Sequence, residues 1–186
     1  MRLAWRVTSR QLNPNKLVFV DESGTHLNMS RDYARSVRGE RAYSRAPYHP
    51  GERTNLIAAL STSGIQAPWL VTGGSVDTAT FITYVEHILC PTLLAGQIVI
   101  LDNYSIHTDS KIRELLELKG CSLRFLPTYS PDFNPIENAF SKIKALLRQA
   151  NASTQDALSQ AIKLACNAIT LQDTLAWFRL CGYSAQ

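Results

Sequence analysis

No stretch of this sequence is long and apolar enough to cross a membrane, because none approaches the ~18 consecutive apolar residues that a span needs. The four cysteines are far apart and show no paired spacing, which argues against a disulfide framework or a zinc site and favours reduced thiols. Arginines at positions 2, 6 and 10 interrupt anything like the apolar core of a signal peptide. These absences predict a protein that is not exported and stays in the cytoplasm.

Internal repeats and glycine-rich phosphate loops are missing as well. The stretch "VTGGSVD" has two glycines after a predicted strand, but it lacks the Gly-x-Gly-x-x-Gly or Gly-Lys-Ser/Thr pattern of a phosphate cradle. A nucleotide-binding α/β protein is therefore not favoured. What is present is typical of one globular domain with or without a small appendage: 186 residues, 45% of them apolar and 18% charged.

Basic residues are unevenly distributed along the chain. Residues 1–53 contain ten Lys and Arg against five Asp and Glu, whereas residues 54–186 contain nine against ten. No Lys or Arg lies between Arg53 and Lys111, so we expect this stretch to form the apolar centre of the fold. The basic surplus near the N-terminus suits either an ordinary solvated face or a surface that binds a polyanion.

Apolar periodicity predicts strands first and then helices that alternate with strands. Residues 16–23 predict a strand buried on both faces, residues 24–29 its hairpin partner, and residues 54–71 two strands around a Ser-Gly turn. Further buried strands are predicted at 97–103 and 122–127. Hairpins followed by strand–helix–strand units imply a mixed sheet with helices on its faces.

Helical spacing of apolar residues predicts helices at 78–89, at 109–119, and starting near 134, 153 and 170. Ser153 with Asp156, and Thr170 with Asp173, have the spacing of capping boxes. The predicted organisation is an N-terminal arm (1–15), a core (16–150) with a basic excursion at about 30–53, and C-terminal helices packed on the core (151–186).

Two of the apolar strands end in an aspartate, Asp21 in "VFVD" and Asp102 in "VILD". Either one could be a turn or capping residue, but an ionised carboxylate beside a buried run is costly unless something positive meets it. If the two strands are neighbours, their ends converge where ligands bind in open α/β sheets. A divalent cation would relieve the repulsion between the carboxylates, and oxygen ligands suit Mg²⁺ or Mn²⁺.

A third carboxylate would complete a site for two metal ions about 3.5–4 Å apart. Glu22 points away from Asp21 on an extended chain, so we expect a solvated or turn role for it. Asp132, in Ser-Pro-Asp, is most simply a turn residue. Glu137 lies in the first turn of a helix that starts at Asn134, where it is either a capping carboxylate or a metal ligand.

The helical face that follows Glu137 carries Ser141, Lys144 and Arg148 at i+4, i+7 and i+11. Basic groups behind a carboxylate would suit phosphate binding, although a solvated helix shows the same pattern by chance.

Three blocks of the sequence resemble the catalytic blocks of DDE transposases of the mariner-like superfamily and their bacterial insertion-sequence relatives. These blocks are "VFVDESG", "VILDNYSIH" and "LPTYSPDFNPIENAFSKIK", and the last is the most specific. Between Asp102 and Glu137 lie 34 residues, a spacing typical of this group. The resemblance runs from about residue 16 to the C-terminal "GY". It implies an α/β, RNase H-like mixed five-stranded sheet flanked by helices, with extra C-terminal helices and with the first and fourth strands adjacent.

The resemblance implies that Asp21, Asp102 and Glu137 hold two Mg²⁺ ions, for which Mn²⁺ can substitute. The implied activity is cleavage of transposon ends and joining of the freed 3′ ends to target DNA, usually at a TA dinucleotide, in the bacterial cytoplasm or nucleoid. His107 matches the family's Asp-Asn…His block and could orient a ligand or contact the scissile phosphate, or be a loop histidine without a chemical role. The residues expected to surround the three carboxylates and to hold the site in position are Asn103, His107 and Asn134.

The basic excursion is the predicted DNA contact, with a solvated loop or a subunit-contact arm as alternatives. Tyr43 or Tyr48 could stack on bases. The arginines and lysine expected to contact phosphates are Arg31, Arg35, Arg38, Arg41, Arg45 and Arg53 in the excursion and Lys144 and Arg148 on the helix.

Relatives of this group act as homodimers and carry an N-terminal pair of helix-turn-helix modules. About fifteen residues precede the first predicted strand, too few for such a pair, so we expect the catalytic half alone, with the DNA-recognition region separately encoded or missing. The alternatives to a transposase are an RNase H-like metal-dependent nuclease and a non-catalytic DNA-binding regulator derived from a transposase.

Overall fold

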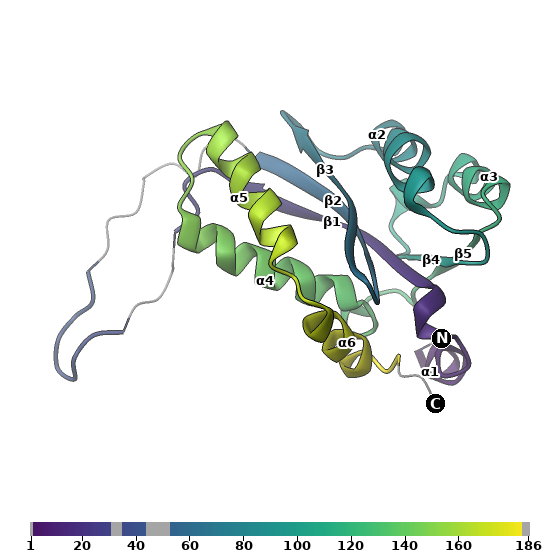
Figure 1. Ribbon diagram of the computed structural model, residues 1–186, viewed down its shortest axis with the longest axis horizontal. Coiled ribbons are helices and arrows are strands. Elements are labelled where there is room, and N and C mark those ends of the chain that lie inside the picture. Colours follow the sequence, from purple (N-terminus) through teal and green to yellow (C-terminus); the bar gives the residue numbers. More distant parts are fainter. Residues whose placement is uncertain (1, 31–34, 44–52, 184–186) are drawn as a thin grey trace.

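The computed structural model describes residues 2–30, 35–43 and 53–183 (Figure 1). Arg31, Arg45 and Tyr48, which the sequence predicts to contact DNA, lie outside the described residues. Within these ranges, no helix combines the length and the apolar character that a membrane crossing requires.

A mixed five-stranded sheet in the order β3-β2-β1-β4-β5 forms the centre of the molecule. β1 pairs antiparallel with β2, which pairs antiparallel with β3, whereas β1–β4 and β4–β5 are parallel. The predicted mixed sheet and the adjacency of its first and fourth strands are therefore confirmed. The strands are β1 (Leu17–His26), β2 (Arg53–Ser61), β3 (Gly64–Thr72), β4 (Ile98–Leu101) and β5 (Ser122–Phe125).

The hairpin partner predicted at 24–29 is wrong, because β1 continues without a turn to His26 and pairs there with Arg53 of β2. The Arg53 side chain lies over Gly24, where a Cβ atom would come within 2.9 Å of its guanidinium. Thr25 is buried and its hydroxyl donates to the Thr54 carbonyl at 3.1 Å. The antiparallel partner of β1 is therefore β2, which follows the basic excursion in the sequence. Pairing within the sheet, and not a local turn, determines the conformation of the segment after Ser23.

Helices cover both faces of the sheet (Figure 1). Because side chains alternate along a strand, Leu17 and Phe19 pack into one apolar cluster while Val18 and Val20 pack into the other. The first cluster includes residues of α4 (Pro135–Ala150), α5 (Gln155–Asn167) and α6 (Leu171–Leu180), and the second those of α2 (Thr78–Tyr84), the π-helical turn Val85–Leu89 and α3 (Ser110–Leu118). Both faces are thus buried, as the continuous apolar run at 16–23 predicts.

The N-terminal arm forms a helix, α1 (Arg2–Ser9), whose Trp5 packs against the first cluster. The sequence analysis does not predict this helix.

Of the two predicted capping boxes, only the second is present. Thr170 and Asp173 form it at the start of α6. The Ser153–Asp156 box is wrong, because the N-cap of α5 is Thr154, whose hydroxyl accepts from the Ala157 N–H at 3.2 Å. Ala152 is buried and its carbonyl accepts the Asn28 N–H at 2.8 Å, which holds the chain in place just before the helix starts.

Candidate active site

The two predicted aspartates lie at the edge of the sheet where β4 ends: Asp102 directly follows this strand, whereas Asp21 is in the middle of β1, which continues to His26. Phe19 of β1 is in register with Ile100 of β4, and continuing this parallel register by two residues sets Asp21 opposite Asp102. The two strands are therefore neighbours, as predicted, but the prediction that the first of them ends at Asp21 is wrong, because its pairing with β2 carries it on to His26.

A cleft of about 310 Å³ opens at this edge. Asp21 and Asp102 line it from the sheet, and Glu137 lines it from the first turn of α4. The structure thus brings the three predicted carboxylates to one cleft. The other residues around it are Asn103, Tyr104, Leu126, Pro127, Thr128, Tyr129, Ser130, Pro131 and Asn134.

Asp21 is the buried carboxylate of the cleft, with 8% of its surface exposed. One of its oxygens accepts the Glu22 N–H at 2.8 Å, and the other accepts the Asn134 side-chain amide at 2.9 Å. Burial, followed by repulsion from Glu22, Glu137 and Asp102, raises the pKa of Asp21 to about 8. The charge of the ionised form is uncompensated within the described residues, and a bound cation would compensate it.

Asn134 occupies the N-cap position of α4, as predicted, but its side chain does not cap the helix. Its amide nitrogen donates to Asp21, while its Oδ1 is buried without a hydrogen-bond partner among the described residues. Glu137 is exposed, and no hydrogen bond to its carboxylate is found in the described ranges. The helix start therefore directs Asn134 toward Asp21 and leaves Glu137 free in the cleft.

His107 is fully buried between two carboxylates. Its Nδ1 lies 2.6 Å from Asp102 and its Nε2 lies 2.9 Å from Glu22. Burial lowers the pKa of His107, but the hydrogen bonds to Asp102 and Glu22 outweigh burial and raise it to about 10. The imidazolium therefore donates to both carboxylates at neutral pH. The expected solvated or turn role of Glu22 is wrong, because its side chain is only 17% exposed and anchors this histidine.

Asp102 is held in one orientation by these contacts. Burial would raise its pKa, but the hydrogen bond and charge of His107 and the Tyr104 N–H, at 3.1 Å, lower it on balance. His107 thus contacts Asp102 and Glu22 and does not itself line the cleft.

Replacing His107 with Gln is expected to destabilise the protein by about 2 kcal/mol at pH 6, because the largely buried Glu22 and the half-exposed Asp102 lose their charged partner. The pKa of His107 is higher in the folded protein, about 10, than its ordinary value of 6.5, so its contribution is complete below pH 6.5 and is lost as the pH rises through about 10. Urea unfolding at pH 6 and pH 10 measures the difference. His87→Gln, an exposed position, is the control, and an equal loss at both pH values would contradict the ion pairing.

The donor chemistry of the cleft fits a hard divalent cation, although the side chains are not gathered around one. In the described part of the chain, no three His, Cys, Asp or Glu side chains are close enough together to hold a metal ion. The cleft nevertheless offers three carboxylates and the unpartnered carbonyl oxygen of Asn134, and these hard oxygen ligands suit Mg²⁺ or Mn²⁺. Closing around an ion requires these side chains to draw together, and Glu137, to whose carboxylate no hydrogen bond is found in the described ranges, is the one free to turn.

Of the predicted DNA-binding residues that the structure describes, none lines the cleft. Arg35, Arg38 and Arg41 are exposed on the described part of the excursion, 35–43, which extends away from the sheet (Figure 1). Lys144 and Arg148 are half-buried on α4, and Arg148 already makes a contact there.

Tyr104 and Tyr129 are cleft residues to which the sequence analysis assigns no role. They are 58% and 93% exposed, and Tyr129 has a left-handed φ of 54°, which is uncommon for a residue other than glycine. The position of Tyr129 before Ser-Pro predicts a turn but does not reveal this conformation.

The strand order, and the acidic cleft beside Asp21 of β1 and the end of β4, are those of an RNase H-like fold. Residues 16–159 match the sequence profile of the family described as DDE superfamily endonuclease. This match covers most of the chain, and the chain belongs to that family. The predicted resemblance to DDE enzymes is confirmed. No curated protein matches the sequence.

Solved structures of Mos1 transposase share the fold. A pre-cleavage Mos1 transpososome is 19% identical, with a TM-score of 0.75 over 96% of this chain and 55% of the other. The mariner Mos1 paired-end complex with Mg is 18% identical, with a TM-score of 0.73 over 97% and 59%. The Mos1 catalytic domain with Raltegravir and Mg is 15% identical, with a TM-score of 0.71 over 97% and 90%. The chain spans about 55% of the length of the first of these proteins.

Proposed function

We propose that this protein is the catalytic domain of a DNA transposase that cleaves transposon ends and joins the freed 3′ ends to target DNA, with TA sites preferred. The observation that carries the proposal is the meeting of Asp21, Asp102 and Glu137 at one cleft in a chain of the DDE endonuclease family. The Mos1 neighbours are named as transposon-end and metal complexes, which supports DNA and divalent cations as ligands here.

The three carboxylates would hold two Mg²⁺ ions, with Mn²⁺ as a substitute. When bound, such ions activate the attacking oxygen and stabilise the leaving oxygen. The surrounding residues keep two of the ligands still: Asn134 and the Glu22 N–H hold Asp21, and His107 holds Asp102. His107 is fully buried and both of its ring nitrogens contact carboxylates, so it presents no free nitrogen to the cleft as a general base would.

Glu137 is the adjustable ligand of the proposed site. It projects from a rigid helix start and is exposed, with no hydrogen bond to break before it turns toward the ions. The helix N-terminus, which favours negative charge, supports its ionised form.

The proposal is tested with a pre-cleaved duplex that carries the terminal repeats flanking the gene, incubated with a supercoiled plasmid and Mg²⁺ or Mn²⁺. Joined products inserted at TA support a transposase. Cleavage without joining favours the RNase H-like nuclease. If DNA binding is the only activity and it is unchanged in Asp102→Asn, the protein is a non-catalytic regulator.

We further propose that the active complex is a homodimer in the bacterial cytoplasm and that a separately supplied helix-turn-helix region recognises the transposon ends. The exposed arginines of the excursion would contact phosphates, and they would do so outside the cleft. A subunit-contact arm remains the alternative role of the excursion.

Replacing Arg35, Arg38 and Arg41 together with Ala is expected to weaken DNA binding and to lower the slope of log Kd against log salt concentration by about 3, because each phosphate contact contributes about 0.9. Fluorescence anisotropy with a short duplex over a range of salt concentrations measures both quantities.

The control is the triple Ala variant of three exposed basic residues on or next to α3, namely Lys111, Arg113 and Lys119. It should leave the slope unchanged. If the excursion variant keeps the wild-type slope but loses dimerisation, the excursion is a subunit-contact arm.

A further inference from the structure

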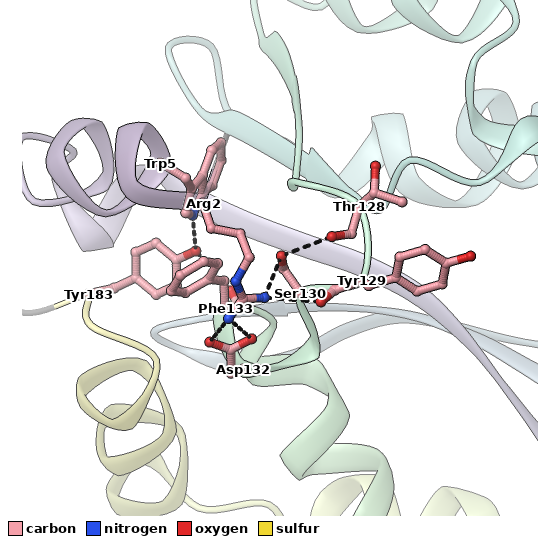
Figure 2. A network of polar contacts seen from close by, with 8 residues as sticks. All are labelled: Arg2, Trp5, Thr128, Tyr129, Ser130, Asp132, Phe133 and Tyr183. Atoms are coloured by element: carbon pink, nitrogen blue, oxygen red, sulfur yellow. Dashed lines mark hydrogen bonds and ion pairs between the residues drawn. The ribbon is translucent and has the colours of Figure 1, made fainter.

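A network of polar contacts joins α1 to the loop that forms one wall of the cleft (Figure 2). The Arg2 guanidinium donates to the Tyr129 carbonyl at 3.0 Å and to the Ser130 hydroxyl at 2.8 Å. Its other terminal nitrogen donates to both carboxylate oxygens of Asp132, at 2.9 and 2.7 Å. One side chain from the start of the chain therefore binds three residues that are about 130 positions away.

Aromatic contacts join the same two segments. Arg2 and Arg6 lie over the Phe133 ring, 5.0 and 5.7 Å from its centre. The Trp5 indole donates to the Tyr183 hydroxyl at 3.0 Å, and this hydroxyl donates to the Phe133 carbonyl at 2.8 Å. The loop is thus held from α1 directly and also through Tyr183 after α6 (Figure 2).

The held loop leads directly into the active site. Residues 131–133 form a tight 3-10 turn, in which the Phe133 N–H bonds the Ser130 carbonyl and the Asn134 N–H bonds the Pro131 carbonyl at 2.9 Å. The next side chain, Asn134, donates to Asp21. Because these hydrogen bonds join Asp132 and Asn134 within one short turn, a shift at Asp132 is expected to move Asn134 two residues later.

The backbone conformation of Tyr129 independently indicates that contacts with other residues hold the loop in place. Its φ of 54° is left-handed, and a residue other than glycine keeps such a conformation where its surroundings hold it. The Arg2 bond to its carbonyl supplies that hold, while its side chain points away from the network (Figure 2).

We propose that Arg2 is a positioning residue of the active site: by clamping Tyr129, Ser130 and Asp132, it sets where Asn134 and Glu137 stand relative to Asp21. Arg2 does not line the cleft and touches no reacting atom. The inference rests on the proposed function for its effect on catalysis, but not for its effect on Asn134.

A merely structural role for the Arg2–Asp132 pair predicts a different balance between lost stability and lost activity when the pair is removed. The two side chains are 47% and 46% exposed, and exposed ion pairs contribute little to stability. Loss of the clamp should therefore leave the melting temperature almost unchanged while catalysis falls, since a misplacement of about 1 Å can lower the rate about 100-fold.

The first experiment compares Arg2→Ala, Asp132→Asn and the double variant with Arg10→Ala, an exposed arginine just after α1. We expect kcat for cleavage to fall about 10- to 100-fold in both single variants, with KM for DNA unchanged. The double variant should lose no more than either single one, because the two residues act as a unit. Arg2→Lys, which keeps the charge but not the paired hydrogen bonds, should have a kcat between those of the wild type and Arg2→Ala. It replaces Arg2→Ala in the comparison if that variant does not fold.

The second experiment needs no activity. The side-chain amide of Asn134, assigned by its loss in Asn134→Asp, is followed by ¹⁵N NMR in the metal-free protein. Its signal should shift or broaden in Arg2→Ala and stay in place in Arg10→Ala. An unmoved signal overturns the inference, and so does a moved signal with an unchanged kcat. If the wild type cleaves nothing, the proposed function fails, and the amide signal alone decides whether Arg2 positions Asn134.

Discussion

Replacing Asp21 with Asn is expected to abolish metal-dependent cleavage and also to make the metal-free protein more stable above pH 8. Loss of a carboxylate that is proposed to hold the metal ions should lower the rate by about a thousand-fold or more, since such ions supply several kcal/mol of transition-state stabilisation. The gain in stability has a separate cause in the buried charge.

The sign follows from the two pKa values of Asp21, 3.8 in the unfolded chain and about 8 in the folded protein. Below pH 3.8 the carboxyl is protonated in both states and has no pH-linked effect. As the pH rises from 3.8 to about 8, the folded state binds the proton more tightly than the unfolded state, so wild-type stability falls. An amide at position 21 does not titrate, and the variant should gain about 2–5 kcal/mol over the wild type at pH 9 relative to pH 3.5.

Urea unfolding in EDTA at several pH values measures this gain, and a plasmid cleavage assay measures the loss of activity. Asp156→Asn, an exposed residue in the first turn of α5, is the matched control and should follow the wild type. Mg²⁺ should raise the melting temperature of the wild type and of the control but not that of Asp21→Asn. If Asp21→Asn still cleaves DNA, Asp21 is not a residue of the active site. If the stability of this variant changes with pH in parallel with that of the wild type, the charge of Asp21 is compensated in the folded protein.

Replacing Glu137 with Gln is expected to abolish cleavage and strand joining by about a thousand-fold or more while the fold is kept. Glu137 is exposed, so the loss of stability should be limited to the interaction of a charge with the start of a helix, about 0.3–1 kcal/mol. The two interpretations of this residue give opposite results, because Gln can still cap a helix but is a poor ligand for Mg²⁺.

Cleavage, joining and thermal unfolding of Glu137→Gln are compared with those of Glu114→Gln, an exposed glutamate on α3. The control should keep both activity and stability. An active Glu137→Gln variant would mean that the carboxylate only stabilises the start of α4. Another group would then have to be the third ligand of the metal site.

Much of the fold could be predicted from local patterns. Apolar runs bounded by turn residues located β1, β2, β3, β4 and β5 to within a few residues, and i, i+4 spacing located α3 and α4. These features depend on neighbours in the sequence, because burial on one face repeats with the period of the element itself. The hairpin partner at 24–29 failed because no local signal reports which distant strand β1 will pair with.

The candidate site, too, could be predicted from the sequence only in part. The three carboxylates could be found from the sequence, since two follow apolar runs and the third opens a helix in a specific motif. The roles of their neighbours could not. The link from His107 to Glu22 spans 85 positions and the link from Asn134 to Asp21 spans 113.

The sequence by itself determined the class of this protein, because the order of its elements and the acids at their ends are local properties. The tertiary structure decided which partner each polar group has. Asn134 turns to Asp21 instead of capping its own helix, and Glu22 turns to His107 instead of solvent. Arg2 reaches the cleft loop only because α1 packs beside it. A buried polar group takes the best partner that folding places within reach, and that partner depends on the packing of the whole chain.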